Sequence, residues 1–278
     1  MAYEKIGGRP LEYYPCSYGA SRLMFRGPKQ EIGEKYVAFL GSTETYGKFI
    51  ARPFADLLED MSEVQCLNLG VPNAGVDSFL NDAATLDLAA EASLTVLQVM
   101  GAQNLSNRYY SVHPRRNDRF LGASQSMLSA FPDVDFTEFH FTNHMLGSLI
   151  NEGTERFMLL LRELQDAWVA RMKLLLDRIP GPKVLLWFAD HGPDEKVGFN
   201  HLASCPFGVT QKMLSQVQNR VADTVIVKAS AAALARGNEG MIFTPFEASA
   251  TLRLLGPAAH VEVAFALRPI IEKQLAPL

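Results

Sequence analysis

Five short apolar runs alternate with longer amphipathic segments along the chain. The runs have the length of buried strands and cover residues 36–40, 64–70, 93–101, 184–189 and 223–229. Near-continuous apolar strands are typical of parallel sheets that are covered on both faces, and helical spacers between them predict right-handed βαβ units. The pattern therefore predicts an α/β protein, with three α/β/α layers around a five-stranded parallel, flavodoxin-like sheet.

Helical periodicity is clearest in residues 151–179, where apolar side chains recur every three or four positions. Pro180, Gly181 and Pro182 follow this segment and predict its end. A second helix is expected after the first strand, and Pro53 marks either its start or a kink.

The strands are unevenly spaced, and this suggests how one domain fills residues 1–278. Residues 1–35 are rich in glycine, proline and tyrosine and predict an irregular N-terminal arm. Residues 105–182 separate the third and fourth strands and predict a mostly helical insertion beside the sheet.

Composition narrows the function classes. Hydrophobic residues make up 48% of the chain and charged residues 20%, which is ordinary for a globular protein. A net charge of −4 argues against a broad nucleic-acid-binding surface. No apolar run approaches the roughly 20 residues of a membrane span, and no leader precedes the arm, so we expect a cytoplasmic protein without membrane contact.

Cofactor and metal motifs are missing from the sequence. It has no phosphate-loop, dinucleotide-binding or zinc-protease motif. Its three cysteines are too sparse for a disulfide framework or a zinc site, and Cys66 is expected to be buried in a strand. We therefore expect no cofactor and no metal.

Small polar residues follow the first three predicted strands. They are Ser42, Thr43 and Glu44 after the first strand, Gly70 and Asn73 after the second, and Gln103 and Asn104 after the third. Since ligands bind at the carboxyl edge of an open parallel sheet, these loops should converge there. Hydroxyl and amide groups can supply a nucleophile and oxyanion donors, although the two hydroxyls could instead cap the next helix and the amides could brace the loops.

These three loops resemble the first three sequence blocks of the SGNH (GDSL-type) hydrolase and acyltransferase superfamily. The first block reads Gly-Ser-Thr-Glu-Thr-Tyr-Gly here, at residues 41–47. The resemblance implies that Thr43 stands in the nucleophile position and Ser42 in the preceding aspartate position. It also implies that the Gly70 N–H and the Gln103 side chain contribute to the oxyanion hole.

The chain departs from that superfamily at the general base. Thr251 stands at the position that matches the aspartate of its Asp-x-x-His motif, and Leu254 at the position that matches the histidine. His260 matches a later histidine that is not catalytic. His191, which follows the fourth strand beside Asp190, is the best substitute base, although it could simply be a loop histidine bonded to the backbone. His201 is a weaker candidate in the same loop.

A dense group of cations lies inside the insertion. Arg108, His113, Arg115, Arg116 and Arg119 are interleaved with aromatic residues. Guanidinium groups bind phosphate, sulfate and carboxylate in two-point contacts, so this loop predicts an anion-binding role near the pocket. The alternative is a set of buried salt bridges to Asp133, Asp135 and Glu138.

His140 and His144 have the spacing of a metal-binding helical pair. Aromatic neighbours favour a packed aromatic helix instead. The whole chain also resembles an uncharacterised bacterial family that shares the motifs at residues 43–47 and 112–120.

The leading functional hypothesis is an SGNH-like esterase or acyltransferase. Its partner would be a small polar molecule, anionic or carbohydrate in nature. Two alternatives stay open: a sulfuryl or phosphoryl transferase that uses the arginines, and a binding protein that kept the fold without catalysis. The apolar stripe of residues 151–179 is either core or the face of a homodimer.

Overall fold

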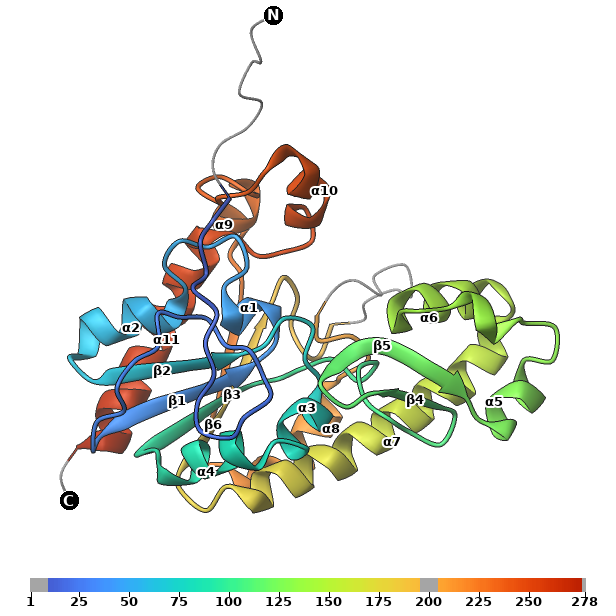
Figure 1. The fold of residues 1–278 in the computed structure, drawn as a ribbon, viewed down its shortest axis with the longest axis horizontal. Helices are drawn as coiled ribbons and strands as arrows, with labels where there is room; N and C mark the ends of the chain where they lie inside the picture. Colours follow the sequence, from blue (N-terminus) through green and yellow to red (C-terminus); the bar gives the residue numbers. More distant parts are fainter. Residues whose placement is uncertain (1–9, 196–204, 277–278) are drawn as a thin grey trace, which may run out of the picture.

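The computed structural model describes residues 10–195 and 205–276. Its main sheet has the strand order β2-β1-β3-β6-β7, with every neighbouring pair parallel (Figure 1). The strands are β1 (Tyr36–Gly41), β2 (Gln65–Gly70), β3 (Leu94–Gln98), β6 (Lys183–Ala189) and β7 (Asp223–Lys228). The predicted α/β class and five-stranded parallel sheet are therefore confirmed.

Helices cover both faces of the sheet because successive strand residues point to opposite sides. Val37 and Phe39 of β1 belong to the core under α2 (Phe54–Ser62) and α11 (Pro257–Leu275). Ala38 and Leu40 belong to the larger core on the other face. That face is covered by α3 (Val76–Leu80), α4 (Ala83–Glu91) and the long α7 (Thr154–Arg178).

His260 joins α11 to α2 inside the core. Its Nδ1 accepts a hydrogen bond from the Phe54 N–H at 3.2 Å, and its ring stacks on that of Phe54. Phe54 is the first residue of α2, so the imidazole satisfies an N–H that has no partner within the helix. Burial lowers the pKa of His260 to about 3, and the ring is therefore a neutral structural group.

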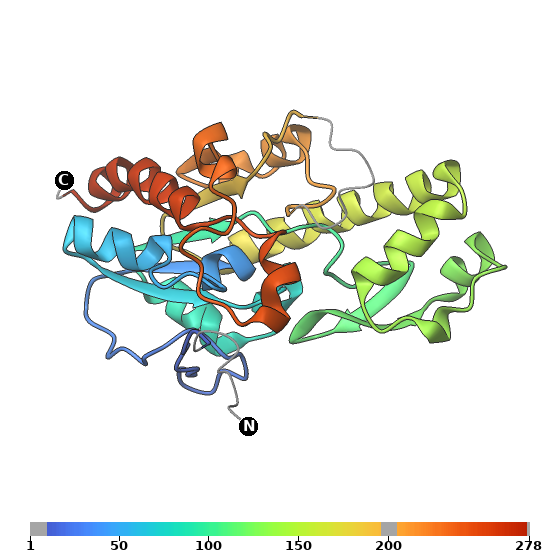
Figure 2. The same cartoon turned by 90° about the horizontal axis from the view of Figure 1, so that it is seen from above.

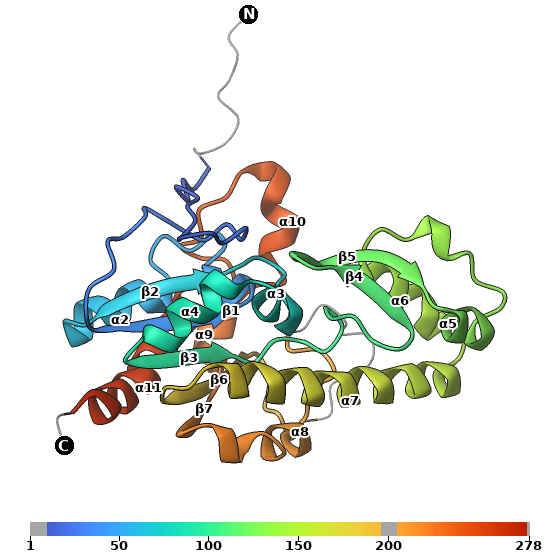
Figure 3. The same ribbon diagram turned by 60° about the horizontal axis from the view of Figure 1, so that its bottom comes forward.

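The insertion between β3 and β6 contains a β-hairpin as well as helices. The Arg-rich segment, expected to be a loop, forms β4 (Tyr110–His113) and β5 (Arg116–Ala123). Helices α5 (Gln125–Ala130) and α6 (Thr142–Asn151) follow it. Figures 2 and 3 show hairpin and helices beside the sheet, with α7 running from the sheet along the insertion.

Two helical predictions within the insertion need correction. The helix predicted for residues 151–179 begins at Thr154, because Gly153 adopts a positive φ of 146° and separates α6 from α7. His140 precedes α6 and pairs through its carbonyl with the N–H of Phe120. His140 and His144 therefore do not share a helix, and the His144 ring packs edge-on against Phe139.

Residues 10–35 lie against the rest of the protein as an irregular segment. It has one isolated bridge, between Cys16 and Phe25. The Arg26 guanidinium donates to the carbonyls of Gly47 and Ala51, at 2.9 and 2.8 Å, which fixes the loop between β1 and α2.

The segment between β7 and α11 extends beyond the carboxyl edge of the sheet (Figure 1). It contains α9 (Ala231–Ala235) and α10 (Ala248–Thr251), together with short 3₁₀ turns. α1 (Thr43–Tyr46) lies at the same edge, and α8 (Gln211–Ser215) precedes β7. Within the described ranges, no helix combines the length and apolarity that crossing a membrane requires.

Candidate functional site

The loops that follow β1, β2 and β3 meet at the carboxyl edge of the sheet. The Thr43 hydroxyl accepts the Asn73 N–H at 2.9 Å and donates to Asn73 Oδ1 at 3.2 Å. The Asn104 side-chain amide donates to the Asn73 carbonyl at 3.1 Å. A Cβ at Gly75 would lie 1.7 Å from the Asn104 carbonyl oxygen, so glycine is required for this close contact of two loops.

A cavity of about 430 Å³ lies over these loops. We call it the polar cavity, because hydroxyl, amide and charged groups form most of its wall. Its lining residues are Ser42, Thr43, Glu44, Lys48, Pro72, Asn73, Gln103, Asn104, Asn143, Cys205, Ser249, Ala250, Arg253 and Leu254. Six residues selected from the sequence are thus brought together: Ser42, Thr43, Glu44, Asn73, Gln103 and Asn104.

Glu44 is the buried carboxyl of this cavity. Its Oε2 accepts a hydrogen bond from Gln98 Nε2 at 2.9 Å. Gln98 Oε1 in turn accepts from the Ser42 N–H at 2.9 Å and the Thr45 hydroxyl at 2.6 Å, so the amide is fixed in orientation. Burial raises the pKa of Glu44, and the Gln98 amide only partly opposes this shift. Among the described residues no cation forms an ion pair with Glu44, and a carboxyl in this setting can exchange a proton nearer to neutral pH.

One buried polar atom of the cavity wall lacks a partner among the residues that the structure describes. The Gln103 side chain is 6% exposed, and its Oε1 accepts no hydrogen bond. Ser42 is also buried, and its hydroxyl makes no capping hydrogen bond to α1. Buried polar groups in native proteins are rarely left unpaired, so the Gln103 side chain is a candidate for ligand contact.

The hydroxyl groups of Ser42 and Thr43 do not cap the helix that follows them. Ser42 occupies the N-cap position of α1, but its side chain makes no capping bond. The Thr43 hydroxyl is bonded to Asn73 of the neighbouring loop instead. The capping alternative from the sequence is therefore wrong, and Thr43 braces two loops.

The Gly70 N–H is already used within the protein. It donates to Asn68 Oδ1 at 3.0 Å, and Asn68 also binds the Thr45 carbonyl through its amide. In this arrangement Gly70 has no N–H left for a substrate oxyanion, and the expected donor role does not fit the geometry.

His191 does not line the polar cavity. Its Nδ1 lies 2.6 Å from Asp190 Oδ1, and its ring packs edge-on against Trp187. In the described part of the chain no histidine is hydrogen-bonded to the hydroxyl of Ser42 or Thr43. His201 lies outside the described residues.

Of the two positions matched to the superfamily's Asp-x-x-His, one lies in the wall of the polar cavity. Leu254 lines the polar cavity. The Thr251 hydroxyl donates to the Ala248 carbonyl and accepts from the Asn238 amide. The position of the expected base thus faces the cavity, but it carries a leucine.

The arginines of the insertion do not point into the polar cavity. Arg108 forms an ion pair with Glu163 of α7 at 3.3 Å, and Arg119 lies over the ring of Phe141. Arg115 and Arg116 are exposed at the turn between β4 and β5, where both N–H groups bind His113 Nδ1. None of these five residues lines the polar cavity, so the anion-binding prediction finds no support in the geometry.

The alternative salt bridges are also wrong. Arg108 pairs with Glu163, and the Asp135 carboxylate accepts from the backbone and hydroxyl of Thr137. Within the described residues, neither Asp133 nor Glu138 forms an ion pair with the insertion's arginines.

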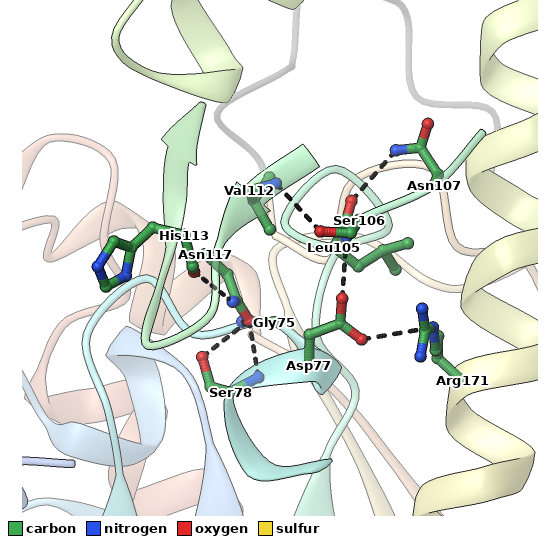
Figure 4. Close-up of polar contacts among 10 residues, drawn as sticks. All are labelled: Gly75, Asp77, Ser78, Leu105, Ser106, Asn107, Val112, His113, Asn117 and Arg171. Carbon is green, nitrogen blue, oxygen red and sulfur yellow. Dashed lines mark hydrogen bonds and ion pairs between the residues drawn. The ribbon is translucent and has the colours of Figure 1, made fainter. Parts of the chain in front are cut away.

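The hairpin is held by its asparagine rather than by its arginines (Figure 4). Asn117 Oδ1 accepts from the N–H groups of Gly75 and Ser78 and from the Ser78 hydroxyl, and Asn117 Nδ2 donates to the His113 carbonyl. The adjacent Asp118 accepts from the Asn73 side-chain amide at 3.2 Å. The motif at residues 112–120 therefore docks the insertion onto the loop that positions Thr43.

Sequence reasoning missed three functional candidates in the cavity wall: Lys48, Arg253 and Cys205. Arg253 lies between Thr251 and Leu254, the two positions matched to the superfamily's Asp-x-x-His. This match could have pointed to Arg253 as a residue of the site. Lys48 and Cys205 carried no comparable signal. In the described part of the chain, no group of three histidine, cysteine or acidic side chains is arranged to hold a metal ion.

A family model described as a domain of unknown function (DUF6473) matches residues 1–275. The comparison with curated proteins found no match.

Proposed function

The chain belongs to this DUF6473 family, and we propose that its polar cavity is the active site of an ester hydrolase or acyltransferase. The substrate would be a small polar molecule that carries a negative charge. Glu44 carries the proposal, because it is a buried carboxyl fixed by Gln98 in the cavity wall. The Ser42 hydroxyl lies in the same wall, as does the Gln103 side chain, whose Oε1 has no partner among the described residues.

In the proposed reaction Glu44 acts as general base and then as general acid. Its carboxylate takes a proton from a water molecule or an acceptor alcohol, whose oxygen attacks the ester carbonyl carbon. The carbon–oxygen bond to the leaving alcohol then breaks, and Glu44 returns the proton to that oxygen. The Gln103 amide N–H groups are the candidate donors to the carbonyl oxygen as it gains charge.

Thr43 is a positioning residue in this proposal. Its proton points to the Asn73 amide oxygen, which is too weak a base to activate a nucleophile. The resemblance to the SGNH loops supports the reaction class. Leu254 at the matched histidine position is the reason why we assign proton transfer to Glu44.

Two cations of the cavity wall favour an anionic substrate. Lys48 and Arg253 both line the polar cavity, and Arg253 forms no ion pair with the residues that the structure describes. A sulfuryl or phosphoryl transferase would instead be expected to direct several arginines at its ligand. Among the residues that the structure describes, Arg253 is the single arginine of this wall, so ester chemistry is favoured.

A binding protein without catalysis is the second candidate. The observation that favours it is the Thr43 hydroxyl, which both donates to and accepts from Asn73 and has no base beside it in the described residues. The cavity would then only hold its anionic ligand.

The test compares Glu44→Gln with wild type on a panel of small acetate esters with neutral and anionic alcohols. Glu91→Gln, an exposed carboxyl on α4, is the matched control. We expect Glu44→Gln to lower kcat at least about 100-fold, the usual contribution of a general acid–base group, while the control keeps wild-type kcat. Unchanged hydrolysis in Glu44→Gln would overturn the proposal. Anions that raise the Tm without any turnover of the panel would favour the binding protein.

A further inference from the structure

A second cavity adjoins the polar one. It has a volume of about 350 Å³ and shares four wall residues with the polar cavity: Glu44, Cys205, Arg253 and Leu254. The rest of its wall comes from the end of β6, from α9 and from the segment that leads into α11. Figure 1 shows α9 and the segment with α10 beyond the carboxyl edge of the sheet.

This second cavity has a more apolar wall. Its aliphatic and aromatic lining residues are Phe188, Ala189, Ala233, Leu234, Leu252, Leu254, Leu255 and Ala259. We call it the apolar cavity. The polar cavity instead presents five side-chain amides and hydroxyls from the loops after β1, β2 and β3, so the two cavities differ in the part of a ligand that each would favour.

Specific contacts fix the shape of the apolar cavity. A Cβ at Gly256 would lie 2.4 Å from the Gly237 carbonyl oxygen, so glycine permits the close approach of α11's first turn to the chain after α9. The Asn238 amide donates to the Thr251 hydroxyl at 3.0 Å across the same wall. Such contacts indicate a preformed cavity, as small-molecule sites usually are.

We propose that the apolar cavity binds the acyl group of the substrate while the polar cavity binds its negatively charged alcohol. The ester bond would then cross the shared wall beside Glu44. This inference rests on the proposed function and adds the substrate class: an ester of a short apolar acid with an anionic alcohol.

The shared wall suits this division. Cys205 is a free thiol there, and burial raises its pKa well above the usual range. It therefore packs as a neutral, weakly polar group rather than as a thiolate nucleophile. Arg253 reaches both cavities and can pair with the charge of the alcohol. Hydrolysis would add water across the ester, leaving the carboxylic acid in the apolar cavity and the alcohol in the polar one.

The experiment uses acetyl, butyryl and hexanoyl esters of 4-hydroxy-3-nitrobenzoate, whose release is followed by absorbance. In wild type we expect kcat/KM to rise at least tenfold from acetyl to hexanoyl, because each buried methylene is favourable. Leu234→Asp, at a wall position that is 42% exposed, should abolish this preference, so that the ratio of hexanoyl to acetyl kcat/KM falls to about one. Leu159→Asp, on an exposed part of α7, is the control and should keep the preference for the hexanoyl ester.

Outcomes separate this inference from the proposed function. Equal kcat/KM along the series in wild type, or a preference kept in Leu234→Asp, would overturn the acyl-binding role even if Glu44→Gln is inactive. Wild-type rates in Glu44→Gln would overturn the proposed function instead. Leu252→Asp, at another exposed wall position, repeats the test if Leu234→Asp does not fold. Calorimetric titration with hexanoate gives a readout without turnover: tighter binding than acetate is expected, and equal binding would contradict the inference.

Discussion

The Thr43 hydroxyl and Asn73 form a reciprocal contact between two loops: the Asn73 backbone N–H donates to Thr43 Oγ1, and Thr43 Oγ1 donates to the side-chain oxygen Oδ1 of Asn73. Asn73 adopts a positive φ of 58°, a conformation that asparagine tolerates better than most residues. Its side-chain amide continues to Asp118 on β5. The first two loops of the candidate site are thereby connected to the insertion.

Thr43→Val tests this contact. Valine keeps the shape but leaves the Asn73 N–H without a partner, so we expect the free energy of unfolding to fall by about 1–3 kcal/mol. Thr43→Ser keeps the hydroxyl and should lose less. Denaturant unfolding measures both variants, and equal losses in the two would show that the hydroxyl does not stabilise the loops.

Among the polar residues of the hairpin, Asn117 should be the one whose substitution lowers the free energy of unfolding most. Three donors converge on its Oδ1, and Asn117→Ala would leave them unpaired in a buried position. We expect a loss of about 3 kcal/mol in the free energy of unfolding. Asn117→Asp keeps the acceptor and should lose less, while Arg116→Ala on the exposed turn should change little. A loss of under 0.5 kcal/mol in Asn117→Ala would contradict this role.

Glu44 should make stability depend on pH. Because its pKa is raised on folding from 4.5, the folded state holds the proton more tightly than the unfolded state, and this contribution is lost as pH rises above about 4.5. The Glu44→Gln variant has no carboxyl group to titrate at this position. Its free energy of unfolding should therefore rise relative to wild type with increasing pH, by at most about 1.4 kcal/mol per pH unit. Parallel pH profiles of the two proteins would show that Glu44 is not shifted.

His260 should make the free energy of unfolding fall as the pH is lowered, which is opposite to the effect of Glu44. Its pKa falls from 6.5 to about 3 on folding, so the unfolded state takes up a proton first as the solution is acidified. Between pH 7 and pH 4 this titration should cost the wild type about 3 kcal/mol of stability. His260→Phe leaves the Phe54 N–H unpaired and should be the less stable protein at pH 7. The gap should narrow toward pH 4, and a constant gap would contradict a neutral core histidine.

Arg253 should recognise substrate charge, and the hairpin arginines should not. With the proposed ester reaction, Arg253→Gln should raise KM for an anionic ester about tenfold, which corresponds to one charge-assisted hydrogen bond. KM for a neutral ester should stay unchanged. Arg116→Gln is the matched control, and an equal effect of both substitutions would restore the hairpin as the anion site.

Strands and strand-end loops were predictable from sequence because their signals are local. The run around Phe39 is continuously apolar, and a buried parallel strand requires this. Ser42, Asn73 and Gln103 each follow such a strand, and sheet geometry alone places them at one edge.

The hairpin and the cations were not predictable in the same way. The buried face of β5 includes Asn117, whose polar side chain binds α3. A polar residue at a buried position interrupts the alternation of apolar and polar residues that would have predicted a strand. Arg108 was expected near the ligand because it is charged, yet its partner Glu163 lies on a helix 55 residues away. Lys48 and Arg253 share one cavity only because α1 and the α10 segment both lie at the carboxyl edge.

The strand order also sets the sequence in which the sheet can be assembled. β3 pairs with β6, as in Val96 opposite Val184, and residues 99–182 lie between the two strands. During synthesis at about 5–20 residues per second, β2, β1 and β3 emerge several seconds before β6. For that interval one side of β3 has unpaired N–H and C=O groups. A nascent chain paused within the insertion therefore presents an apolar strand edge that a chaperone must cover or that a second nascent chain can pair with.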